Sequence, residues 1–318
     1  MADARICRGV EPLSASLPPL PTTKASLAYI KPLDRYDHEI PYRWRGPLDK
    51  AHSLLRSNIE LETVDIPVRD VSGIVQPECQ RLSLARNGFE IAPYSGVEDS
   101  ALSVPEQLET YLEEITDVVK MRTVGDLAVC FNFAFRKCHG HMLGNPELSL
   151  QSEDPRGSFS SPNTPGFQVH SDYTQDFAKS LIGQFLTTDE AEEYLTDRYR
   201  RWIVNAWKPL HKTVENAPLA FCDPSTVSPV DALEVDLPSL TGMTRTTYYK
   251  YNPQQEWYWC RSQTPTQVSL FKSWDSDHEE GSWPAVPHAA LRFPEDQFDD
   301  TVLRESIESR ILVAIRKE

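Results

Sequence analysis

The second half of the chain is a series of short β-like segments with no helix between them. Turns containing Pro, Asp or Gly separate these segments. Strands that follow one another without crossover helices pair in antiparallel fashion. The sequence therefore predicts a mainly β fold, a sandwich or barrel with a jelly roll among the possibilities. The segments are RWIVNAW (201–207), RTTYYKY (245–251), EWYWC (256–260), QVSLFKSW (267–274), HAALRF (288–293) and SIESRILVAI (306–315).

The first half of the chain is mixed, which makes the whole an α+β arrangement. Residues 1–30 contain SLPPLPTT and lack periodicity, so they predict a Pro-rich extended arm. Strands are expected at TVDIPV (63–68), NGFEIAPY (87–94) and LAVCFNFAF (127–135). A Ser- and Pro-rich segment, 144–166, predicts a long loop.

Two helices are expected between these strands. The first begins with Ser103 as its cap and Pro105 in its first turn, and Glu106 completes an S-x-x-E capping box. The second has an acidic first turn before Ala191, Tyr194 and Leu195. Apolar residues of the first helix recur at helical spacing: Leu108, Tyr111, Leu112, Ile115, Val118 and Val119.

Composition excludes some classes of protein. The 318 residues are 40% hydrophobic, which is enough for a core, and we treat 1–318 as a single domain. A net charge of -15, with 32 dispersed Lys and Arg, argues against nucleic-acid and membrane partners. The six cysteines form no C-x-x-C, and no apolar run reaches membrane-spanning length. We expect a soluble cytoplasmic monomer or homodimer that acts on a small molecule.

The most informative short motif is VHSDYT (169–174), in which His170 and Asp172 stand two apart. At this spacing on a strand edge both side chains point to one face and can share a metal. Chance alone would supply roughly one H-x-D in every two such sequences, so the motif needs support from elsewhere. His288 follows Pro287 and opens an apolar segment, and it is the best second histidine. Two imidazoles and one carboxylate with open positions suit non-haem Fe(II) oxygenases.

A ferrous oxygenase that uses a 2-oxo acid also needs a cation for the far carboxylate of that cosubstrate. Sixteen residues after His288, the segment RESIESR places Arg304 and Ser306 on one strand face, with Arg310 in the same parity. A surface Arg paired with Glu305 or Glu308 is the alternative interpretation.

In this order, these motifs resemble the Fe(II)/2-oxoglutarate-dependent dioxygenase superfamily. More closely, residues 160–316 resemble the fungal hydroxylase/desaturase family of secondary metabolism, which includes relatives of a bacterial cephamycin-pathway methoxylase. DIPVRDVSG and NGFEI match more faintly upstream. The matching stretches are VHSDYT, RYRRWIVNAWKPLHKTVENAPLAFCDPSTV, TTYYKYNPQQEWYWCRSQTPTQVSLFKSWDSD, VPHAAL and RESIESRILVAI.

The resemblance implies a double-stranded β-helix (jelly-roll, cupin-like) core with N-terminal helical and extended additions. It also implies Fe(II) held by His170, Asp172 and His288, with 2-oxoglutarate and O2 as cosubstrates. The anchor for 2-oxoglutarate would be Arg304 with Ser306, and Arg310 competes for that role. The implied reaction is oxidation of a substrate C–H bond by hydroxylation, desaturation or cyclisation.

Two positions depart from the family pattern: Ala289 follows the distal histidine where relatives often carry Thr, and the loop WDSDHEEG is unusually acidic. These departures concern substrate contacts more than the metal. Asn205 and Trp207, on one face of their strand, are candidate substrate contacts, as are Tyr248, Tyr249 and Trp257.

Three other functions were weighed. A methyltransferase would need a Gly-rich turn in a βαβ series, and no G-x-G occurs in the chain. A zinc hydrolase or lyase could use the same His-Asp-His ligands but would need neither O2 nor 2-oxoglutarate. A non-catalytic β-sandwich binding module would use His288 only for packing.

Overall fold

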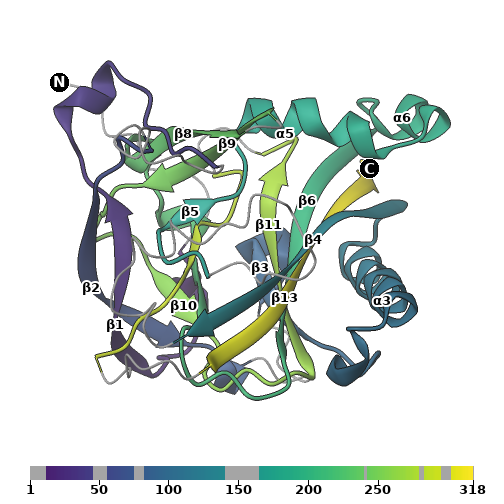
Figure 1. The fold of residues 1–318 in the computed structure, drawn as a ribbon, viewed down its shortest axis with the longest axis horizontal. Helices are drawn as coiled ribbons and strands as arrows, with labels where there is room; N and C mark the ends of the chain where they lie inside the picture. The colour runs from purple at the N-terminus through teal and green to yellow at the C-terminus, as the bar shows by residue number, and fades with distance from the viewer. Residues whose placement is uncertain are drawn as a thin grey trace.

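Two β-sheets face each other and form the body of the protein, as the computed structural model shows (Figure 1). The structure describes residues 12–45, 56–74, 82–139, 165–239, 242–278, 283–294 and 302–317. The predicted loop at 144–166 lies almost entirely outside these residues, as do the first eleven positions of the predicted arm.

Within the described residues, the larger sheet has eight strands, and its pairs are antiparallel except β2 with β10. The two histidines of the candidate metal site lie on its central strands, β12 and β5. The strands in sheet order are β1 (Thr22–Ile30), β2 (Leu61–Asp70), β10 (Trp257–Trp259), β7 (Leu219–Cys222), β12 (His288–Ala290), β5 (His170–Ser171), β9 (Gly242–Tyr249) and β8 (Ala232–Ser239).

The smaller sheet has five antiparallel strands among the described residues, with the last strand of the chain, β13, paired on both sides. Bulges interrupt the pairing of β13 with β4 next to Arg304 and next to Arg310. The strands in order are β3 (Phe89–Pro93), β11 (Gln267–Asp275), β6 (Tyr199–Leu210), β13 (Val302–Arg316) and β4 (Leu127–His139).

The helices lie outside the two sheets. The α-helices of the described residues are α1 (Leu13–Ser16), α2 (Leu84–Asn87), α3 (Pro105–Thr123), α5 (Gln175–Ile182) and α6 (Thr188–Tyr194). Short 3-10 helices are η1 (Asp34–Asp37), η3 (Ser72–Ile74), η4 (Asp99–Ala101), η6 (Gly183–Phe185), η7 (Pro224–Thr226) and η8 (Pro229–Asp231).

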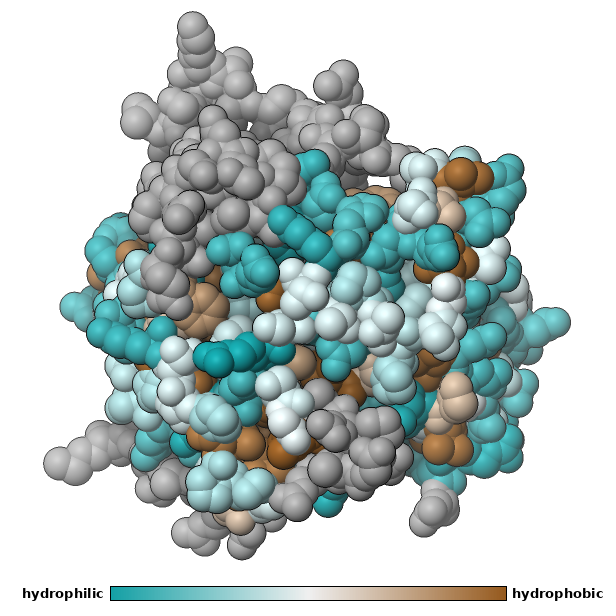
Figure 2. Space-filling model, turned by 90° about the horizontal axis from the view of Figure 1, so that it is seen from below, coloured by the Kyte–Doolittle hydropathy of each residue, from teal (hydrophilic) through white to brown (hydrophobic). Residues whose placement is uncertain are grey.

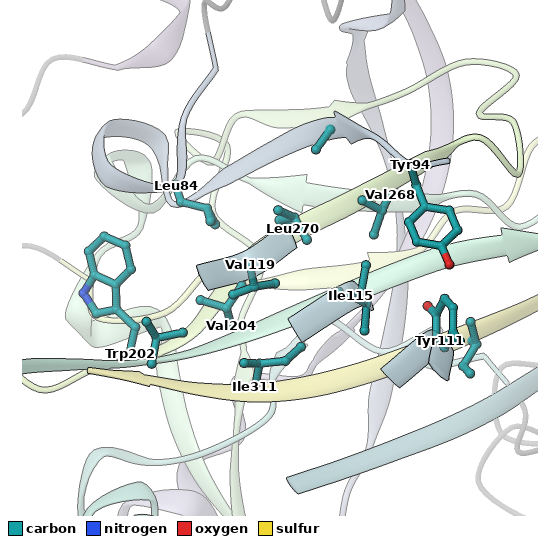
Figure 3. Close-up of a cluster of buried hydrophobic side chains, with 14 of the residues drawn as sticks. Leu84, Tyr94, Tyr111, Ile115, Val119, Trp202, Val204, Val268, Leu270 and Ile311 are labelled. Carbon is teal, nitrogen blue, oxygen red and sulfur yellow. The ribbon is translucent and has the colours of Figure 1, made fainter. Parts of the chain in front are cut away.

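Helix α3 covers the outer face of the smaller sheet. Its buried side chains Tyr111, Ile115 and Val119 pack against apolar residues of β6, β11 and β13. Figure 3 shows Ile115 and Val119 beside Val204 and Ile311. The apolar face of α3 packs on every second residue of these strands. The alternate residues point to the inner face of the sheet, which faces the cavity.

The predicted first helix is confirmed, but its capping box is wrong. Helix α3 begins at Pro105 with Val104 as the N-cap, and no side chain caps its start. Proline at the first helical position needs no amide partner, which explains why the helix starts there without help from Ser103. The capping box belongs to α6 instead, where Thr187 and Glu190 satisfy each other's backbone amides.

The predicted strands of the second half are all present, and the expected strands at 63–68, 87–94 and 127–135 correspond to β2, β3 and β4. The strand β3 follows Gly88, which adopts a left-handed φ of 78° at the end of α2. A side chain at position 88 would also meet the Val286 side chain at 2.7 Å. Glycine therefore serves both the turn and the close approach.

The predicted N-terminal arm is wrong for residues 22–30. These residues form β1, which pairs along its whole length with β2 and buries Ala25, Leu27 and Tyr29. The prolines before this segment suggested an extended arm. Its apolar residues are also concentrated at one end instead of alternating, so the two-residue repeat of a strand was not visible. Sequence reasoning also missed β7 and β8, which are short or carry polar residues.

The surface is mostly polar on the face shown in Figure 2, where hydrophobic residues gather in several small groups. None of the helices in the described ranges has the length and apolar character that crossing a membrane requires.

Truncating the α3 core contact should destabilise the protein strongly. Ile115→Ala removes a fully buried side chain and leaves a cavity, for which we expect a loss of about 2–5 kcal/mol in the free energy of unfolding. Met121→Ala, on the same helix but 71% exposed, is the control and should change stability by less than about 0.5 kcal/mol. Denaturant unfolding of both variants measures this, and equal losses would contradict the packing described here.

Candidate metal centre

The two histidines of the site lie side by side in the middle of the larger sheet. His288 of β12 pairs directly with His170 of β5, and His170 pairs with Tyr248 of β9. Residues opposite one another in neighbouring strands point to the same face of a sheet. The imidazole centroids of His170 and His288 are accordingly 4.4 Å apart, on the face turned toward the smaller sheet.

Backbone carbonyls orient both imidazoles in the same way. Nδ1 of His170 lies 2.8 Å from the carbonyl oxygen of Gln168, and Nδ1 of His288 lies 3.0 Å from that of Val286. Each contact requires a proton on Nδ1, which leaves a lone pair on Nε2 for a metal. Burial, with His288 nearby, lowers the pKa of His170 to about 3, so this imidazole is neutral near pH 7.

Asp172 follows β5 directly and reaches across to the smaller sheet. Its Oδ2 lies 2.5 Å from Nδ2 of Asn205 and 3.2 Å from Oγ of Ser273, and its Oδ1 lies 3.2 Å from Nη2 of Arg310. Burial opposes ionisation of Asp172. The Arg310 guanidinium and the neighbouring histidines outweigh that effect and hold the pKa of Asp172 well below its usual range.

Together His170, Asp172 and His288 fit a divalent metal. One ligand atom from each lies within 4.8 Å of the others, and Oδ1 of Asp172 is 4.0 Å from Nε2 of His170. An octahedral ion with three protein ligands on one face keeps open positions for cosubstrates, which is the arrangement of non-haem Fe(II) sites. The His170 ring packs closely against Gly166, where a Cβ would come within 2.9 Å of it.

A cavity of about 900 Å³ lies between the two sheets and includes the three ligands. That volume accommodates a cosubstrate and a small organic substrate together. Tyr248 and Phe271 flank the histidines, and the stacked rings of Phe131 and Phe185 extend the wall away from the metal site. The cavity wall thus combines aromatic rings with charged groups, which include Arg43 and Arg45 as well as those at the metal site and Arg304.

The predicted anchor pair, Arg304 and Ser306, lies on the inner face of β13 and is buried. Nη1 of Arg304 donates to the carbonyl of Ala217, and the guanidinium lies 5.2 Å from the ring centroid of Trp207. Within the described residues, Nε of Arg304 and Oγ of Ser306 have no hydrogen-bond partner. Burial lowers the pKa of Arg304 to about 10, so the group remains charged. Orphaned buried donors of this kind fit a missing carboxylate.

Arg310, the competing anchor, is fully engaged by protein groups. Besides Asp172, it contacts Oε1 of Glu308 and Oδ1 of Asn132, each at 2.8 Å. The structure therefore places Arg310 beside the three candidate ligands, whereas Arg304 keeps an unpartnered Nε within the described residues.

The candidate substrate contacts do not all face the cavity. Trp207 lines the cavity beneath Arg304, and Asn205 is hydrogen-bonded to Asp172, so it supports a metal ligand. Tyr249 points to the opposite face, where its hydroxyl contacts Ser171 and Trp283, and Tyr248 faces the cavity in its place. Adjacent strand residues face opposite sides of a sheet. Because Tyr248 pairs with His170, Tyr248 shares the cavity face of the histidine and Tyr249 lies on the other face.

The same parity applies to Ala289 and Trp257. Both are packed with Tyr249 in the core on the far side of the sheet. The departure from the family pattern at Ala289 therefore does not touch the cavity.

Sequence reasoning treated Glu308 only as a surface partner for an arginine and missed it as part of the site. It is 5% exposed and lines the cavity, with Oε2 at 2.8 Å from Nε of Arg136. Its parity with Arg304 and Arg310 in RESIESR was the available signal. Ser273 and Arg136 carried no such signal, because only the packing of the sheets brings them near.

Known proteins resemble this chain over most of its length. A family described as "Oxidoreductase/YMDC permease-like domain" matches residues 27–314. The hydroxylase/desaturase efuI of Hormonema carpetanum is 29% identical over 243 residues, covering 73% of this chain and 78% of that protein. The Fe(II)/2-oxoglutarate-dependent dioxygenase nvfI of Aspergillus novofumigatus is 28% identical over 205 residues, covering 64% of this chain and 66% of that protein.

A solved structure confirms the predicted jelly-roll fold. The iron and alpha-ketoglutarate-dependent endoperoxidase NvfI matches with a TM-score of 0.72 and 22% sequence identity. The match covers 93% of this chain and 99% of that chain.

Removing one imidazole should abolish tight metal binding. His288→Ala leaves two ligands, and we expect the bound divalent metal per protein to fall from about one to near zero after gel filtration. His211→Ala is the control, since His211 is 49% exposed and contacts Glu305 outside the site. Metal analysis by mass spectrometry measures both, and unchanged metal content in His288→Ala would refute the site.

Proposed function

The chain belongs to the oxidoreductase/YMDC permease-like domain family, and we propose that it oxidises a C–H bond of a small-molecule metabolite with Fe(II), 2-oxoglutarate and O2. The resemblance to fungal hydroxylase/desaturases and Fe(II)/2-oxoglutarate-dependent dioxygenases is confirmed by a relative with each of those names. Hydroxylation, desaturation and oxidative cyclisation are the reactions proposed for it.

One observation carries the assignment of the cosubstrate. Arg304 and Ser306 present buried donors without partners in the described structure, and Arg304 lines the same cavity as the metal ligands. A dicarboxylate fits this arrangement, because one carboxylate can reach the metal while the other is paired with the guanidinium. We propose that Arg304 and Ser306 bind the far carboxylate of 2-oxoglutarate and that His170, Asp172 and His288 hold Fe(II).

The iron, when bound with its cosubstrates, supplies the oxidising chemistry, and the protein supplies position and environment. Trp207 supports the plane of Arg304, and the Ala217 carbonyl fixes one end of that guanidinium. The aromatic wall that includes Phe131, Phe185 and Tyr248 excludes water and holds an apolar substrate next to the metal site.

The other functions weighed from the sequence explain less of the site. A zinc hydrolase or lyase would use the three ligands but has no need of the Arg304–Ser306 pair. A binding module would need neither the three metal ligands nor the Arg304–Ser306 pair. The cytoplasmic location and the monomeric or homodimeric state expected from the sequence remain predictions.

Removing the proposed anchor should weaken 2-oxoglutarate binding. Arg304→Met keeps the length of the side chain and its packing on Trp207 but removes the charge. We expect about a 10- to 100-fold increase in the Kd for 2-oxoglutarate, since a charged hydrogen-bonded pair is lost. The weak visible absorption band of the anaerobic Fe(II)–2-oxoglutarate complex measures this Kd.

The matched control is Arg316→Met on the same strand, because Arg316 is 67% exposed and its contacts with Asp126 and Tyr199 lie outside the cavity lining. It should leave the band and the Kd unchanged. Absence of the band in the wild-type protein would refute the proposed function. Equal affinities of the wild type and Arg304→Met would refute the anchor alone.

A further inference from the structure

A second buried carboxylate, that of Glu308, lies beside the carboxylate of Asp172, and the proposed function leaves it without a role. The two acids share their partners. Nδ2 of Asn205 lies 2.5 Å from Oδ2 of Asp172 and 2.8 Å from Oε1 of Glu308. Nη2 of Arg310 lies 3.2 Å from Oδ1 of Asp172 and 2.8 Å from Oε1 of Glu308. Glu308 is thus the nearer carboxylate for Arg310.

The orientation of the Asn205 amide follows from the two acids. Its amino group faces both carboxylates, and its Oδ1 lies 2.8 Å from Oγ of Ser273, which can donate to it. The reverse orientation would set the amide oxygen against two anions. With Glu308 in place, the amide nitrogen of Asn205 is the group that faces Asp172, and it donates to Oδ2.

The position of Arg310 matters for the other oxygen of Asp172. Oδ1 is the atom 4.0 Å from Nε2 of His170, so it is the oxygen a metal would use. Arginine and carboxylate groups prefer a bidentate pair with two parallel hydrogen bonds. Such a pair between Arg310 and Asp172 would occupy both oxygens and neutralise the charge that attracts the cation. In the structure Arg310 contacts both oxygens, Nη2 to Oδ1 at 3.2 Å and Nε to Oδ2 at 3.4 Å, but both contacts are longer than its 2.8 Å contact with Glu308.

We propose that Glu308 is a positioning residue, which takes the shorter hydrogen bond of Arg310 and so keeps the contact of Arg310 with the metal-facing oxygen of Asp172 weak enough for a metal to replace it. The inference rests on the proposed function, because it takes His170, Asp172 and His288 as the metal ligands. Asn132, whose Oδ1 lies 2.8 Å from Nη1 of Arg310, restrains the guanidinium from its other side.

Charge balance alone is the competing explanation for Glu308. Arg136 contacts Oε2 of Glu308 at 2.8 Å, so the acid also takes part in an ion pair with a second cation. A role limited to charge balance predicts lower stability of the variant without a specific effect through Arg310. The two explanations differ in whether removal of Arg310 restores metal binding.

The test measures Mn(II) affinity of metal-free protein, with free Mn(II) detected by electron paramagnetic resonance. Glu308→Gln should let Arg310 pair more tightly with Asp172 and weaken Mn(II) binding about 10- to 100-fold, the range typical of changes to residues that support metal ligands. Glu305→Gln is the matched control on the same strand. Glu305 pairs with Lys137 at 2.7 Å and lies outside the cavity lining, so its variant should bind Mn(II) like the wild type.

The double variant with Glu308→Gln and Arg310→Gln separates the two explanations. With no guanidinium to compete, it should recover Mn(II) affinity to within several-fold of the wild type. Wild-type affinity in Glu308→Gln, or weak binding in the folded double variant, would overturn the inference. The double variant decides the matter even where Glu308→Gln does not fold, and thermal unfolding of each metal-free protein monitors folding. Absence of Mn(II) binding in the wild type would instead refute the proposed metal site.

Discussion

The site depends on burying the charge of Asp172 between two sheets. A buried carboxylate is tolerated only when charged and polar partners satisfy it. The partners here, Asn205, Ser273 and Arg310, all come from the smaller sheet, whereas Asp172 follows a strand of the larger one. The same contacts that stabilise the ionised acid therefore also fix how the sheets face each other around the cavity.

The two guanidinium groups on the inner face of β13 are used differently as a result. Arg310 is engaged by Asp172 and Glu308, close to the ligands. Six residues earlier on the same face, Arg304 is held by Trp207 and the Ala217 carbonyl and keeps an unpartnered Nε within the described structure. One strand thus carries both the support of the metal ligand and the proposed cosubstrate anchor, at positions whose spacing the strand itself sets.

Much of this arrangement could be predicted from local pattern. Alternation and turn residues predicted the strands of the second half, and the helical repeat predicted α3. The predictions of an arm at residues 22–30 and of a capping box on α3 were wrong. The former segment is stabilised by pairing with β2, and α3 begins with a proline that needs no cap. Tyr249 was predicted as a substrate contact because a sequence does not reveal which of two adjacent strand residues faces inward.

The sequence by itself determined which residue types the candidate site could use, since His170, Asp172, His288 and the Arg304–Ser306 pair were predicted from residue type, order and strand parity, with Arg310 as a competitor for the anchor. Only the tertiary structure decided how those groups are partnered. Arg304 and Arg310 have the same chemistry and the same parity, and they differ in the groups that the fold places around them, Trp207 and the Ala217 carbonyl for one, Asp172, Glu308 and Asn132 for the other. Glu308 became part of the site for the same reason, because its neighbours Asn205 and Arg136 lie more than a hundred residues away in the chain.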